Sequence, residues 1–172
     1  KKSIFLQSLL KYAEDERNKW ECGRVAPISP TPSDLISLVL DSLHLSTSDT
    51  VIDLGCGDGR WLYHIADRFS CHCWGVDMDT ERISTATHRI KQGNIQTYLH
   101  LILADFSVCN LRYFTVVIVY LSRVGHIKMK DKLISECCPG TVVVSIGFQV
   151  KGWIPQETFR SSDSLVAYKY VI

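Results

Sequence analysis

Glycine and aspartate dominate one heptapeptide, DLGCGDG, which begins at Asp53 and follows a short apolar run. Gly55, Gly57 and Gly59 stand at every second position, and Asp53 and Asp58 flank the first two of them. Glycine adopts positive φ angles and carries no Cβ, so that a ligand can lie directly against the backbone amides. The spacing differs from the G-x-G-x-x-G fingerprint, in which a pyrophosphate lies at a helix N-terminus.

Two more carboxylates follow the next two predicted strands. Asp77 ends the second strand, where a carboxylate can accept hydrogen bonds from both hydroxyls of a ribose. Asp105 follows the third strand and can accept from an adenine amino group, while Phe106 or Met78 can pack on the adenine ring. The alternative is that Asp77 and Asp105 are ordinary helix caps.

The ligand must tolerate these carboxylates. Asp53 and Asp58 would repel a pyrophosphate, but they suit a ligand that carries an amine and a sulfonium, which points to S-adenosyl-L-methionine. A nicotinamide cofactor, or a Rossmann-like fold that binds none, are the alternatives. The residues predicted to bind the cofactor at these strand ends are Asp53, Gly55, Cys56, Gly57, Asp77, Met78, Asp105 and Phe106.

Apolar stripes at helical spacing alternate with short apolar runs along the chain, which predicts an α/β fold with a doubly wound, mostly parallel sheet. Strands are predicted over residues 50–54, 72–76, 97–103, 114–121, 141–147 and 164–171, and helices over 3–19, 60–69, 80–92 and 127–137. A further helix is predicted to start with Thr31 as its cap and Pro32 at its first position. The segment between Phe148 and Ser164 is too short for a crossover helix, so we expect an antiparallel C-terminal hairpin.

Length and composition exclude several classes of protein. The 172 residues suit one domain, which we place at residues 33–172 after an N-terminal helix and linker at 1–32. Nineteen basic residues against eighteen acidic ones give no electrostatic footprint for nucleic acid, and no apolar run is long enough to span a membrane.

The cysteines and histidines lack the spacing of a metal site. Seven cysteines include no C-x-x-C pair, and the six histidines show no ligand spacing, so we expect no metal. Free thiols suit a reducing compartment, and we expect an intracellular location, cytoplasmic or mitochondrial. The chain starts at Lys1 rather than at a methionine, which leaves open a lost targeting segment.

Several motifs occur in the order of a known family: ISPTPSDLISLVLDSL, DLGCGDGR, ADF, VYLS and PGTVVVS…F…GW. This order, over about residues 28 to 172, resembles the small protein-lysine methyltransferases of archaea and their eukaryotic, partly mitochondrial relatives. These are single-domain members of the seven-β-strand class I fold. The resemblance implies that Thr31 folds over the cofactor and that Tyr120 lies by the methyl group. Two departures are Asp77, where the family usually has Glu, and Ser145-Ile146, where it often has Ser-His.

The family resemblance implies a lysine side chain of a protein as the methyl acceptor. A lysine must lose its proton before it attacks, and the hydroxyl of Tyr120 is the candidate that aligns the neutral amine. Trp153 is the candidate that lines the substrate channel, although it can equally cover the edge of the sheet. His126 is a weaker candidate for a base, with a position at the start of a helix as the alternative.

Two other functions remain open from the sequence. The first is a catalytically silent subunit that binds S-adenosylmethionine beside an active partner, and the second is an N-methyltransferase of small-molecule amines. An acidic motif or Asn-Pro-Pro-Tyr after the fourth strand would indicate amide or nucleobase targets, and the observed VYLSRVG has neither.

Overall fold

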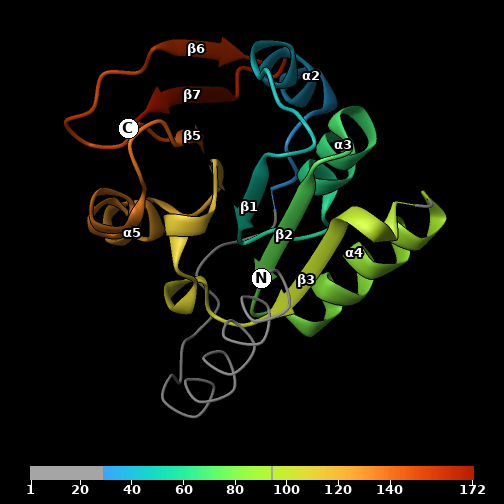
Figure 1. Cartoon of the computed structure of the whole chain (residues 1–172). Coiled ribbons are helices and arrows are strands. Elements are labelled where there is room, and N and C mark those ends of the chain that lie inside the picture. The colour runs from blue at the N-terminus through green and yellow to red at the C-terminus, as the bar shows by residue number, and fades with distance from the viewer. Residues whose placement is uncertain (1–28, 94) are drawn as a thin grey trace.

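The computed structural model of the chain describes residues 29–93 and 95–172 and shows one sheet with helices on both faces (Figure 1). Its strands are β1 Thr50–Leu54, β2 His72–Asp77, β3 Leu99–Leu103, β4 Val116–Val119, β5 Val142–Ile146, β6 Glu157–Arg160 and β7 Val166–Val171. Its helices are α2 Ser33–Ser42, α3 Arg60–Phe69, α4 Thr80–Gln92 and α5 Arg123–Glu136, with short 3-10 turns η1 Gln96–Tyr98, η2 Phe106–Val108 and η3 Leu111–Tyr113. The helix predicted over residues 3–19 lies outside the described residues.

The seven strands have the order β3-β2-β1-β4-β5-β7-β6. Strands β1 to β5 pair in parallel, whereas β7 lies antiparallel between β5 and β6. The predicted doubly wound sheet and its antiparallel C-terminal hairpin are therefore confirmed. The order reverses between β1 and β4, and the carboxyl ends of strands at such a point form the crevice that binds ligands in this class of fold.

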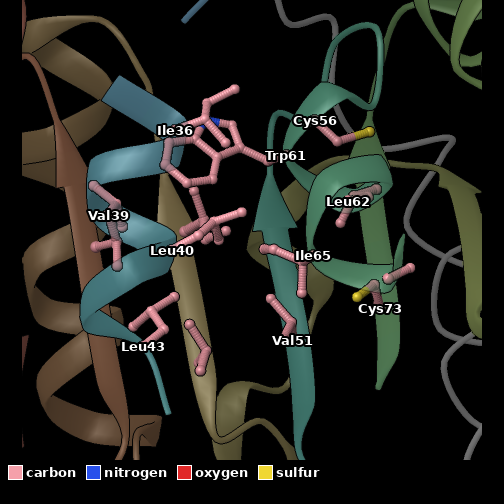
Figure 2. Close-up of a cluster of buried hydrophobic side chains, with 14 of the residues drawn as sticks. Ile36, Val39, Leu40, Leu43, Val51, Cys56, Trp61, Leu62, Ile65 and Cys73 are labelled. Atoms are coloured by element: carbon pink, nitrogen blue, oxygen red, sulfur yellow. The ribbon is translucent and has the colours of Figure 1, made fainter. Parts of the chain in front are cut away.

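The core consists of two apolar layers, one on each face of the sheet. On one face, Val51 of β1 packs with the buried sides of α2 and α3, as Figure 2 shows around Leu40 and Ile65. On the other face, Ile52 of β1 packs with η3 and with Met129 of α5. Because neighbouring residues of a strand point to opposite faces and both faces are covered, the central strand β4 is apolar along its whole length.

Helix α2 is tied to the C-terminal hairpin at two points. The Asp34 carboxylate accepts a hydrogen bond from the Ser162 amide at 2.7 Å, and the Lys169 ammonium donates to the Ser42 carbonyl at 2.9 Å. The predicted cap of this helix is wrong: α2 begins after Pro32 without a side-chain cap. The Thr31 hydroxyl, which we expected to serve as this cap, instead accepts a hydrogen bond from the Trp61 indole.

Other differences from the predicted bounds lie at element ends. Helix α5 begins four residues early, because the Ser122 hydroxyl accepts from the Gly125 amide at 3.2 Å and caps it. Strand β4 ends at Val119, so that Tyr120 lies just beyond it. Among residues 29–93 and 95–172, no helix combines the length and apolar character that a membrane crossing needs.

Gly75 in the middle of β2 gives a test of this packing. A Cβ at that position would lie 2.4 Å from Leu62 Cδ1 and 2.8 Å from Cys56 Sγ. Gly75→Ala should therefore lower the free energy of unfolding by about 1–3 kcal/mol, measured by urea denaturation. Leu62→Val removes the clashing methyl, so Gly75→Ala should cost less in that background. Equal costs in both backgrounds would contradict the proposed clash.

Candidate functional site

The glycine loop lies between β1 and α3 and turns sharply. Gly57 has a φ of 54°, and a Cβ built on it would meet no atom within 4 Å, so its open side faces a cavity. Gly59 has a φ of 71°, and a Cβ there would lie 3.0 Å from the Ala86 Cβ of α4. One glycine thus leaves room for a ligand, while the other lets two helices approach each other.

Hydrogen bonds hold this loop against the end of β2. The amides of Gly55 and Cys56 both donate to the Val76 carbonyl, at 2.8 and 2.9 Å. The Gly57 amide donates to Oδ2 of Asp77 at 2.9 Å, and Oδ1 of the same carboxylate accepts from the Asp79 amide at 3.0 Å. These two amides fix the orientation of the carboxylate at the rim of the cavity. Asp79, rather than Asp77, caps α4.

The segment before α2 is fastened beside the loop by two side chains of α3. Arg60 donates to the Thr31 carbonyl at 2.9 Å and grips the Asp58 carboxylate with two further nitrogens, at 2.7 and 3.0 Å. The indole of Trp61 donates to the Thr31 hydroxyl at 3.0 Å. Thr31 is therefore held at the cavity by contacts that span about 30 residues of sequence.

The cavity lies at the carboxyl ends of β1, β2 and β4 and has a volume of about 890 Å³, a common size for a ligand site. Most of the residues predicted for the site line it, namely Thr31, Asp53, Gly55, Cys56, Gly57, Asp77, Met78, Phe106 and Tyr120. Their individual roles stay predictions, but they are brought together around one space.

Two predicted site residues do not line the cavity. Asp105 caps the turn η2 by accepting from the Ser107 amide at 2.7 Å, although its neighbour Phe106 reaches the cavity. Trp153 packs edge-on against Tyr170, with ring centres 5.4 Å apart. The structure therefore gives Trp153 a packing role, and its contact with a substrate stays a prediction.

Some residues at the cavity were given no role from the sequence. Arg60, Ser122, Arg123 and Phe148 all contribute to the lining. Arg60, Ser122 and Phe148 stand in motifs that carry the family resemblance, which was a usable signal for a place at the site. Among residues 29–93 and 95–172, no three His, Cys, Asp or Glu side chains are arranged to hold a metal ion.

Three carboxylates converge on the site, and they differ in how they are compensated. Burial acts to raise the pKa of Asp58, but Arg60 and Arg89 outweigh it and hold this pKa below its usual value. Asp77 accepts hydrogen bonds from the two backbone amides described above and lies 3.8 Å from the Arg82 guanidinium. Asp53 is 3% exposed and has no hydrogen bond or ion pair with the described part of the chain, and burial, with Asp77 and Asp58 nearby, raises its pKa to about 8.

An uncompensated buried carboxylate at a cavity favours a cationic ligand. The amine and sulfonium of S-adenosylmethionine supply positive charge, and the exposed backbone at Gly57 supplies space. The residues present therefore fit this cofactor.

Comparison with known proteins gives a consistent picture. The sequence profile of the ANTKMT methyltransferase domain matches residues 53–157. The chain is 33% identical over 150 residues to a protein-lysine N-methyltransferase of Saccharolobus islandicus, which covers 85% of this chain and 93% of that protein.

Solved structures agree on the fold. An RNA methyltransferase of Salinibacter ruber, in complex with S-adenosyl-L-homocysteine, has a TM-score of 0.78 and 26% identity and covers 84% of this chain and 94% of that one. A methyltransferase of Geobacter sulfurreducens with the same ligand has a TM-score of 0.59 at 19% identity, over 81% of this chain and 54% of that one.

The pKa of Asp53 predicts how stability depends on pH. An unfolded aspartate ionises near 3.9, so between about pH 4 and pH 8 the folded state keeps a proton that the unfolded state has lost. The contribution of this carboxyl to the free energy of unfolding is greatest below pH 4 and falls as the pH rises to 8. Asp53→Asn should therefore raise the melting temperature of the cofactor-free protein, by a margin that grows from pH 5 to pH 8.

Asp34→Asn is the matched control for this measurement. A hydrogen bond from Ser162 lowers the pKa of Asp34, so that it is ionised in both states throughout pH 5–8. Its effect on the melting temperature should be the same at both ends of this range. A margin for Asp53→Asn that does not change with pH would contradict the raised pKa of Asp53.

Proposed function

We propose that this chain, which belongs to the ANTKMT methyltransferase domain family and is an S-adenosylmethionine-dependent methyltransferase, methylates lysine side chains of proteins. One observation carries the choice of acceptor: the 33% identical relative, matched over 93% of its length, is named a protein-lysine N-methyltransferase. Because the match covers nearly all of that relative, it includes both the glycine loop and the residues around Tyr120.

The cofactor-binding roles follow from where the side chains lie. Asp77, held by two amides, keeps lone pairs on both oxygens that can accept from the ribose hydroxyls. Met78 and Phe106 flank the same rim and provide apolar surface for the adenine, while Asp53 and Gly57 suit the charged methionine end. When bound, S-adenosylmethionine supplies a methyl carbon that is already activated by its sulfonium.

The protein must then position a neutral amine. The reference pKa of a lysine is about 10.4, so deprotonation at pH 7 costs roughly 4–5 kcal/mol, and desolvation within the cavity lowers this cost. Tyr120 is half-buried at the cavity, and within the described part of the chain its hydroxyl has no hydrogen-bond partner. We assign this hydroxyl the role of accepting from, and so aligning, the amine.

The compartment is part of the proposal. The six cysteines within the described residues are all free thiols, five of them buried, which suits a reducing intracellular compartment, cytoplasmic or mitochondrial. The near balance of charge, with a net charge of +1, supports a protein rather than a nucleic acid as acceptor.

Transfer of a labelled methyl group tests the acceptor class. The protein is incubated with tritiated S-adenosylmethionine and, separately, with a protein extract, total RNA and a small-molecule fraction. We expect label in protein, and mass spectrometry of digests should place it on lysine. Label confined to RNA, the acceptor named for the Salinibacter relative, would overturn the proposal, as would label confined to small amines. Cofactor binding without product in any fraction would instead favour a catalytically silent subunit.

Tyr120→Phe tests the role of the hydroxyl. Loss of the alignment should lower kcat for the lysine acceptor by about 10- to 100-fold, because a misplaced nucleophile reacts slowly. Affinity for S-adenosylhomocysteine, measured by calorimetry, should change by less than about twofold. Tyr113→Phe, which alters an exposed tyrosine on η3 away from the cavity, is the control. Full turnover of Tyr120→Phe would rule out the assigned role.

A further inference from the structure

His126 occupies an unusual position for a histidine near the start of a helix. It lies in the first turn of α5, only 8% exposed, and does not line the cavity. Its Nδ1 is 3.0 Å from the Leu121 carbonyl oxygen, and its Nε2 is 2.9 Å from the Ser145 hydroxyl. Because a carbonyl can only accept, Nδ1 carries a hydrogen and donates it.

Ser145 extends this contact to a second segment. Its hydroxyl, on the last but one residue of β5, lies 2.6 Å from the Phe148 carbonyl oxygen. Burial lowers the pKa of His126, so the imidazole is neutral and its Nε2 accepts. The single hydroxyl hydrogen of Ser145 is therefore shared between Nε2 and the Phe148 carbonyl. The Phe148 ring also meets the His126 ring edge-on, with centroids 5.3 Å apart. One imidazole thus joins the chain that follows β4, through Leu121, to the chain that follows β5, through Phe148.

Both joined segments border the cavity around Tyr120. Leu121 and Phe148 line it, and Tyr120 is the residue directly before Leu121. A Cβ on Gly147, directly before Phe148, would lie 3.4 Å from a ring carbon of Tyr120, so the tyrosine ring packs against this second segment. The placement of the Tyr120 ring therefore depends on both segments that His126 connects.

The cofactor half of the cavity has separate supports. The glycine loop is held by the Val76 carbonyl and the Asp77 carboxylate, and Thr31 is held by Arg60 and Trp61. None of these hydrogen bonds involves His126 or Ser145. Leu121 touches the glycine loop only through its side chain, which lies 3.1 Å from a Cβ built on Gly55. Loss of the imidazole bridge should therefore disturb the part of the cavity around Tyr120 and leave the hydrogen bonds of the glycine loop in place.

We propose that His126 is a positioning residue for the methyl acceptor, which acts through Leu121 and Ser145–Phe148 to fix the part of the cavity around Tyr120. This inference rests on the proposed function for its choice of acceptor. It assigns His126 no proton transfer, because the side chain does not reach the cavity. A buried polar bridge between two loops orients the groups that touch the substrate, and misplacement by about 1 Å can cost 10²-fold in rate.

Steady-state kinetics on single-site variants tests the inference. The acceptors are synthetic peptides with a single lysine, chosen from a randomised pool by methyl transfer from the wild-type enzyme. Ser145→Ala and His126→Phe should lower kcat/KM for the peptide by about 10- to 100-fold. Their affinity for S-adenosylhomocysteine should stay within about twofold of wild type. Ser135→Ala, on the exposed side of α5, should change neither quantity.

The double variant separates a shared pathway from general damage. If both residues act through one bridge, His126→Phe with Ser145→Ala should lose no more activity than His126→Phe alone. Additive losses, full activity in either single variant, or an equal loss of cofactor affinity would each overturn the inference.

Amide hydrogen exchange gives a readout that does not need an acceptor. In Ser145→Ala, amides at residues 121–123 and 148 should exchange faster, whereas those at residues 55–59 should be unchanged. Unchanged exchange at residues 121–123 and 148 would overturn the inference whatever the acceptor. A different outcome is that the wild-type enzyme methylates no lysine peptide while Ser145→Ala still exchanges faster at these residues. This outcome would contradict only the proposed function and would support the bridge.

Discussion

The folding of the glycine loop against the end of β2 is the contact on which the whole cavity depends. The successive amides of Gly55 and Cys56 share the Val76 carbonyl, and the next amide, of Gly57, donates to the Asp77 carboxylate. This arrangement turns the chain sharply enough that Gly57 faces open space and α3 starts beside the rim. Arg60 and Trp61, in the first turn of that helix, then reach back to Thr31, so the helix start also places the segment before α2.

Three carboxylates, Asp53, Asp58 and Asp77, line the cavity, and their negative charges are compensated to different degrees. Asp58 is paired with two arginines, and Asp77 with backbone amides and Arg82, whereas Asp53 is buried without a counter-charge. The protein alone would be more stable with a neutral group in place of Asp53 at neutral pH. A site that keeps such a group is suited to a ligand that brings its own positive charge, which is a common conflict between stability and function.

Local patterns predicted the fold well, while long-range contacts decided what they missed. The bounds of β1, α3 and α4 agree with the sequence because apolar periodicity, the glycine loop and neighbouring turns all lie within a few residues. The use of Thr31 depends on Trp61, about 30 residues away, and so could not be read from its resemblance to a cap. Nine proposed site residues line one cavity because the ends of parallel strands meet, but no local pattern shows that Trp153 packs on Tyr170 instead.

The ties between α2 and the C-terminal hairpin affect the order in which the domain can assemble. Asp34 and Ser162 lie 128 residues apart in the sequence, and Ser42 and Lys169 lie 127 apart. Helix α2 is therefore synthesised well before its partners in the hairpin, and these hydrogen bonds can form only after the hairpin has been made. Until then the apolar side of α2 lacks part of its cover, which makes the nascent chain dependent on late, non-local closure and slows its folding.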